Sequence, residues 1–124
     1  MSSKVKEYTG NLSALAGDVN YTGVGFQPTS MTVMWTNNDG KLSFGTGFCD
    51  SALGQSVIGG WYSSSGTVGT VSHANYFIWD YTMAGMGAYQ TALVKNYGID
   101  GFTLTWAKTG SPTGTITFEV IAYK

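Results

Sequence analysis

The strongest constraint on the fold is a strict alternation of apolar and polar residues near the end of the chain. Phe102, Leu104 and Trp106 alternate with threonines, and the same pattern returns over residues 116–122. A period of two places successive side chains on opposite faces, so each segment predicts a strand with one buried and one exposed face. The segment Gly-Ser-Pro-Thr-Gly at 110–114 lies between them. Two strands joined by a Gly/Pro turn predict an antiparallel hairpin.

Further short segments of strand character follow one another along the chain. They are residues 5–8, 19–24, 31–35, 42–48, 56–62, 67–72, 76–79 and 91–97. Asn, Asp and Gly at 36–40 and the Ser/Gly tract at 63–66 predict two more hairpins, because these residues accept turn conformations. Only residues 13–16 and 88–93 could hold a helical turn. Many short strands predict an all-β fold, an antiparallel β-sandwich or jelly-roll-like single domain spanning residues 1–124.

The surface of such a domain would carry unusually little charge. Charged residues make up 10% of the chain, and the net charge is −1. Soluble domains typically contain about 25% charged residues. Low charge removes the repulsion that keeps proteins apart, so the composition predicts a surface that associates with copies or partners.

Several classes of partner are excluded by composition. The chain has no arginine and six scattered lysines, whereas nucleic-acid binding needs clustered positive charge. The first residues lack the apolar core of a signal peptide, and no apolar run reaches the length of a membrane span. We therefore expect a protein made in a cytoplasm, without nucleic acid, membrane insertion or cofactor as partner. The single Cys49 rules out an intrachain disulfide and a multi-cysteine metal site.

Catalytic chemistry has weak support. His73 is the only imidazole, so a Ser-His-Asp system would have to form around it with Asp50, Asp80 or Asp100. The chain has no Gly-x-Ser-x-Gly elbow, and Cys49 has no basic neighbour to activate it. We expect no enzyme, and the competing hypothesis rests on His73 with Asp80 or Cys49.

Aromatic residues are the one surplus, and many lie in the middle of the chain. Tryptophan and tyrosine rings stack on sugars and anchor protein interfaces. The glycine-rich segment 82–88 adds two methionines, whose flexible side chains adapt to a partner. The sequence predicts a protein interface or sugar contact formed by Trp61, Trp79, Tyr81, Met83, Met86 and Tyr89.

Residues 21–35 and residues 100–118 are two segments that resemble tailed-bacteriophage structural proteins. Residues 21–35, which contain Gly-Phe-Gln-Pro at 25–28, are similar to the start of a strand in those proteins. Residues 100–118 look like their closing hairpin. The same layout resembles H-type lectin domains, which are small trimeric β-sandwiches that bind sugars. No sugar-binding residue of that family matches this chain position by position.

The resemblance to phage virion proteins implies β-sandwich subunits, often trimeric, without catalysis. It leads us to expect a non-enzymatic virion structural protein, a capsid decoration or cement protein or a head appendage. Its expected partners are itself, as a homotrimer, and phage capsid or tail proteins. The alternative is a lectin-like receptor-binding domain of a phage tail fibre, whose partner would be a surface glycan.

Overall fold

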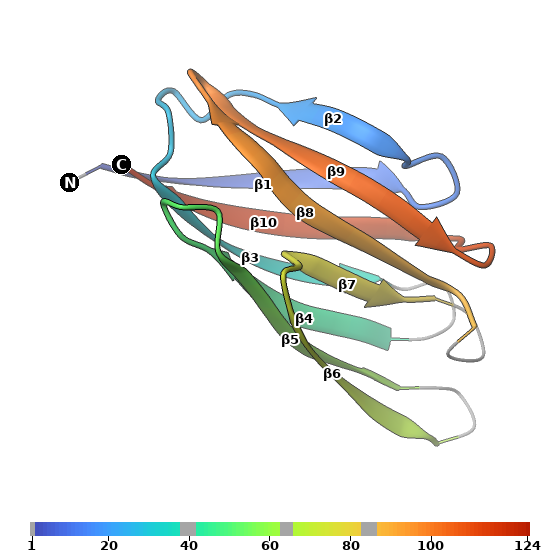
Figure 1. Cartoon of the computed structure of the whole chain (residues 1–124). Coiled ribbons are helices and arrows are strands. Elements are labelled where there is room, and N and C mark those ends of the chain that lie inside the picture. Colours follow the sequence, from blue (N-terminus) through green and yellow to red (C-terminus); the bar gives the residue numbers. More distant parts are fainter. Residues whose placement is uncertain (1, 38–41, 63–65, 83–86) are drawn as a thin grey trace.

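The computed structural model describes residues 2–37, 42–62, 66–82 and 87–124, which form strands and no helix (Figure 1). The strands are β1 (Ser3–Asn11), β2 (Gly17–Tyr21), β3 (Ser30–Asn37), β4 (Leu42–Cys49), β5 (Gln55–Tyr62), β6 (Val68–Ala74), β7 (Ile78–Tyr81), β8 (Tyr89–Gly98), β9 (Gly101–Thr109) and β10 (Thr115–Tyr123).

The strands build two packed antiparallel sheets. A six-stranded sheet has the order β1-β10-β3-β4-β5-β6, and a four-stranded sheet has the order β2-β9-β8-β7. The small sheet lies in front of the large one in Figure 1, and the two termini lie close together at one end. The predicted all-β sandwich is confirmed.

The predicted hairpin at the end of the chain is wrong. β9 pairs with β2 and β8, whereas β10 pairs with β1 and β3 in the other sheet. The buried faces of the two strands meet across the core, where the rings of Trp106 and Phe118 have centroids 5.9 Å apart. Gly110 and Gly114 have φ angles of 70° and 94°, which let the chain leave one sheet and enter the other. Alternation shows that a strand buries one face, but it does not identify the strand that covers this face.

The other two predicted hairpins are confirmed as strand pairs. β3 pairs with β4 and β5 pairs with β6, while most of their turn residues lie outside the described part of the chain. Of the two expected helical turns, residues 89–93 belong to β8 instead. The segment after β1 is a tight loop in which the N–H groups of Ala14 and Leu15 donate to Asn11 O. β7 begins later than expected, at Ile78, because Asn75 turns the chain with a φ of 71°.

Strand register sorts the large sheet into an inner and an outer face. On β3, Met31, Val33 and Trp35 point inward and are buried, while Thr32 and Met34 point outward. Facing them, Phe102, Leu104 and Trp106 of β9 bury their side chains from the small sheet. The core therefore lies between the two inner faces.

Glycines on β4 let the small sheet come unusually close to the large one. β7 lies over β4 and β5, and a Cβ atom added at Gly47 would lie 1.9 Å from the carbonyl oxygen of Phe77. Only glycine fits beneath that backbone. This close approach sets the position of β7.

Candidate functional site

Around β2 and β9 the outer face of the small sheet is polar, and its polar groups satisfy one another. The Asp18 carboxylate forms an ion pair with Lys95 and accepts a hydrogen bond of 2.6 Å from the Thr105 hydroxyl. The Thr103 hydroxyl donates to the side chain of Asn20, also at 2.6 Å. The hydrogen bonds from Lys95 and then Thr105 lower the pKa of Asp18. This part of the small sheet has the character of an ordinary water-exposed surface.

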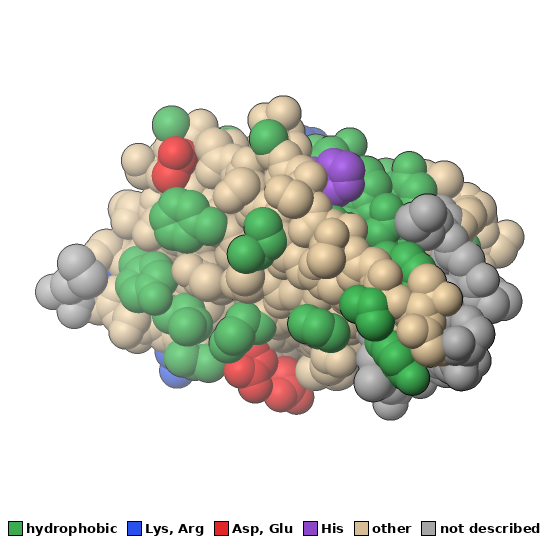
Figure 2. Space-filling view, turned by 90° about the horizontal axis from the view of Figure 1, so that it is seen from below, with side chains coloured by type: hydrophobic (Ala, Val, Ile, Leu, Met, Phe, Trp, Pro, Cys, Tyr) green, Lys and Arg blue, Asp and Glu red, His purple; other side chains and the backbone are tan. Residues whose placement is uncertain are grey.

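The outer face of the large sheet carries more apolar side chains, set among serines and threonines, with Glu7 opposite Glu119 on β1 and β10. Register places seven large apolar side chains on it, and together they form what we call the outer apolar face: Val5, Met34, Phe44, Phe48, Ile58, Tyr62 and Val68. Phe44 is 56% exposed, Ile58 60% and Val68 71%. Figure 2 views the molecule from below and shows hydrophobic side chains spread widely over the surface, with few charged ones among them. Large exposed apolar patches are a common feature of protein contact sites.

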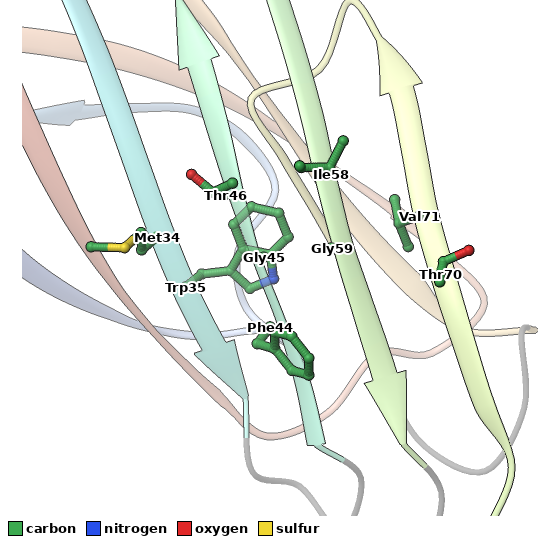
Figure 3. Close-up of a pocket in the computed structure, with 9 residues that line it drawn as sticks. All are labelled: Met34, Trp35, Phe44, Gly45, Thr46, Ile58, Gly59, Thr70 and Val71. Carbon is green, nitrogen blue, oxygen red and sulfur yellow. The ribbon is translucent and has the colours of Figure 1, made fainter.

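A shallow groove crosses the outer apolar face. It has a volume of about 650 Å³ and is walled by Met34, Phe44 and Ile58 from three neighbouring strands (Figure 3). Gly45 and Gly59 lie opposite each other on β4 and β5 and contribute only backbone to its lining. No titratable side chain lines the groove, and the hydroxyls of two threonines are its main polar side-chain groups. Its chemistry therefore suits an apolar side chain of a partner better than a charged ligand.

The aromatic residues singled out in the sequence pack against one another. Trp79 is stacked with His73 at a centroid distance of 3.8 Å and with Tyr89 at 4.8 Å. Tyr81 makes edge contacts with Tyr89 and Trp61, at 5.6 and 6.2 Å. We call these five rings the aromatic cluster. Trp79, Tyr81 and Tyr89 lie on the side of β7 and β8 opposite the buried Ile78 and Asp80. They pack against Trp61 of β5 and His73 of β6 at the edge of the small sheet, where β7 is its last strand.

The stacking of Trp79 with His73 and Tyr89 occupies ring faces on which a sugar could otherwise stack. Trp61 is only 8% exposed because its indole lies against Gly69, where an added Cβ would come within 2.1 Å of the ring. Trp79, Tyr81 and Tyr89 are half-buried. The predicted contact residues Met83 and Met86 lie outside the described residues. A partner contact by any of these six residues remains a prediction.

The candidate catalytic residues lie in separate environments. Cys49 is fully buried on the inner face of the large sheet, and this burial raises the pKa of its thiol. Asp80 is buried and accepts a hydrogen bond of 3.0 Å from the Asn37 amide. His73 is stacked on Trp79, and no hydrogen bond between described residues links it to Asp80 or Cys49. Within the described ranges, no three His, Cys, Asp or Glu side chains group as metal ligands would.

The outer apolar face was missed from the sequence, although β4 carried a signal. Phe44 and Phe48 share one phase of the alternation, and Gly45 and Gly47 share the other. An ordinary reading would bury the phenylalanines, because large apolar side chains usually fill the core. In this sheet the glycine side faces inward, since β7 and Trp35 occupy the space that side chains would otherwise take.

No protein family, curated protein or solved structure matches this chain. In the part of the chain that the structure describes, no helix is long and apolar enough to span a membrane. Its function has to be inferred from its surfaces.

Proposed function

We propose that this protein is a non-enzymatic structural component of a bacteriophage virion, a capsid decoration or cement protein or a head appendage. The observation that carries the proposal is the outer apolar face of the six-stranded sheet. A sandwich that exposes uncharged apolar side chains across β3, β4 and β5 is suited to lie on another protein surface through these strands. The resemblance of residues 21–35 and 100–118 to phage virion proteins supplies the biological setting. It is a likeness of sequence only for residues 100–118, since β9 and β10 do not form the expected hairpin.

The size of this face fits a stable protein contact. Six strands spaced about 4.8 Å apart span roughly 24 Å, and eight-residue strands rise about 26 Å, so the flat area of the whole sheet is about 600 Å². The outer apolar face is the part of this area outside the Glu7–Glu119 pair. β3, β4 and β5 each have eight residues. Protruding side chains add to that area, and standard interfaces bury about 800 Å² on each partner. At about 25 cal/mol per Å² of apolar area, covering the face would supply a substantial driving force.

The composition of the face also indicates its partner. Across β3, β4 and β5 the outward side chains of the described residues carry no charge, so an apolar partner covering these three strands would leave no buried ion unpaired. The outward Glu7 and Glu119 on β1 and β10 would lie at the rim of such a contact. A net charge of −1 opposes self-association very little. We therefore propose two partners: other copies of this chain, in the homotrimer that the resemblance implies, and capsid or tail proteins of the virion.

Two variants test the outer apolar face. Phe44→Ser and Ile58→Ser remove apolar groups that are more than half exposed, so folding should be retained. The matched control is Ala107→Ser, which lies exposed on β9 of the small sheet. Light scattering coupled to size exclusion, at two concentrations, should show an oligomer for the wild type and the control and a lower mass for the two variants. Equal masses for all four proteins would contradict a role of this face in self-association.

The virion setting needs its own test. Antibodies against the purified protein should label the heads of tailed particles produced from the genome that carries this sequence, in immunogold electron microscopy. Particles in which Phe44→Ser replaces the wild-type chain should be labelled less, whereas Ala107→Ser particles should be labelled fully. Purified particles without the protein would refute the virion role, even if the chain self-associates.

A further inference from the structure

β6 forms one edge of the large sheet, and the register shows which of its backbone groups are free. Asn75 N–H donates to Gln55 O at 2.8 Å, which makes this facing pair a hydrogen-bonded one. Facing pairs in antiparallel sheets alternate between hydrogen-bonded and non-hydrogen-bonded. Residues 69, 71 and 73 therefore bond to β5, and the outward N–H and C=O groups are those of Val68, Thr70, Ser72 and Ala74. No hydrogen bond between described residues uses these outward groups.

The two edges of the large sheet differ in their protection against strand pairing. β1, at the opposite edge, carries Lys4, Lys6 and Glu7, and charged side chains discourage the addition of another strand. β6 has the sequence Val-Gly-Thr-Val-Ser-His-Ala, without a lysine, a proline or an acidic residue. β6, which lies at the lower edge of the sandwich in Figure 1, therefore lacks the charged residues that protect β1.

We propose that β6 pairs antiparallel with β6 of a second copy, across a twofold axis at Val71. The strand has seven residues, Val68–Ala74, and Val71 is its centre. Around this axis Thr70 lies opposite Ser72 of the second copy, and Val68 lies opposite its Ala74. All four outward-pointing residues then form hydrogen-bonded pairs, so the strand is complementary to itself over its whole length.

The side chains agree with this pairing. Thr70 and Ser72 are exposed on the outer side, and a threonine opposite a serine is a favourable cross-strand pair. No like charges would face each other between the two β6 strands, because β6 has no lysine, arginine, aspartate or glutamate. The outer apolar face would continue across the seam, since Val68 and Ile58 lie next to it. A second copy is thus the occupant that fits this edge.

The pairing goes beyond the proposed function, because it does not depend on a virion setting. It predicts an even number of copies, either a dimer or a hexamer if the proposed trimer also forms. A charge exchange tests the register. Thr70→Lys combined with Ser72→Lys puts lysines opposite lysines, whereas Thr70→Lys combined with Ser72→Glu puts each lysine opposite a glutamate of the second copy.

The solution mass by light scattering should fall by half in the double-lysine variant and should keep the wild-type value in the Lys/Glu variant. Both substituted positions, Thr70 and Ser72, are on the exposed side of an edge strand, so the fold should tolerate both pairs of substitutions. Unchanged mass in the double-lysine variant would overturn the proposal. A wild type that is monomeric at the highest concentration reached would also overturn it, because β6 would then not pair with a second copy.

A proline pair distinguishes this edge from the other one. Ser72→Pro removes an outward N–H of β6 without touching its bonds to β5. Thr9→Pro removes an outward N–H of β1 in the same way. Lys124 N–H donates to Ser2 O, so the even-numbered residues of β1 bond to β10 and the odd-numbered ones, including Thr9, point outward. We expect Ser72→Pro to halve the mass and Thr9→Pro to leave it unchanged, and the reverse result would overturn the proposal. In the wild type, hydrogen exchange at Thr70 and Ser72 should slow with increasing protein concentration, which tests the pairing without any substitution.

Discussion

Replacing Gly47 by alanine should destabilise the protein far more than a single methyl group suggests. The added Cβ would lie 1.9 Å from the Phe77 carbonyl oxygen and 2.9 Å from its carbonyl carbon. Real Cβ atoms essentially never come closer than 3.0 Å to another heavy atom, so one backbone would have to move by about 1.1 Å, which is 3.0 minus 1.9. Both atoms belong to the backbone, so no side-chain rotation can relieve the clash.

The surroundings make that movement costly. Phe77 N–H donates to Ala92 O at 2.9 Å, and the Phe77 side chain is fully buried. Overpacking a well-packed core with backbone shifts costs about 1–3 kcal/mol, and occasionally more. We expect about 3 kcal/mol for Gly47→Ala, less up to about 1 kcal/mol gained because alanine restricts the unfolded chain. A net loss of about 2 kcal/mol corresponds to a melting temperature lower by roughly 8 °C in a domain of this size.

Urea denaturation measures the free energy of unfolding directly. Gly98→Ala is the matched control, because the nearest heavy atom to its added Cβ is Gly101 O at 3.8 Å, an ordinary contact. The control should differ from the wild type by less than about 0.5 kcal/mol. If Gly47→Ala were as stable as Gly98→Ala, the close packing of β7 on β4 would be refuted.

Two further predictions concern titratable groups. The Asp100 carboxylate accepts hydrogen bonds from Gly23 N–H at 3.1 Å and Gly25 N–H at 2.6 Å, and these bonds lower its pKa from the usual 3.8. The stabilisation is therefore complete at pH values above 3.8 and is lost as the pH falls below 3.8, so Asp100→Asn should be less stable than the wild type near neutrality and approach it in acid. If urea denaturation gave the same difference in unfolding free energy between Asp100→Asn and the wild type at every pH, this linkage would be contradicted. Cys49 is fully buried with a raised pKa, so a thiol reagent should label it only after unfolding, and rapid stoichiometric labelling of the native protein would contradict the structure.

The local signals in the sequence were read correctly where both interacting segments lie close together in the chain. The Asn/Asp/Gly residues at 36–40 and the Ser/Gly tract at 63–66 predicted the β3–β4 and β5–β6 pairs. A short turn leaves the flanking strands no other nearby partner, so turn chemistry was sufficient there. Between β9 and β10 the same kind of signal failed, because five turn residues are also enough to cross between two packed sheets.

The candidate site was less predictable. Trp61 and Trp79 were expected to contact a partner, but an excess of rings does not show whether they face outward or pack together. Phe44 and Ile58 were overlooked because large apolar residues are usually buried. Their exposure follows from the glycines on the opposite side of β4 and β5, over which β7 and Trp35 are packed.

The amino-acid sequence by itself determined the strands, the turns and the all-β class, because a period of two and the backbone preferences of turn residues act over a few neighbouring positions. Which sheet each strand joined was decided only in the tertiary structure, and so were the apolar outer face of the large sheet and the free edge of β6. Each of these depends on contacts between segments far apart in the chain, such as Gly47 beneath Phe77 and Trp106 against Phe118. Such contacts exist only after both layers have packed.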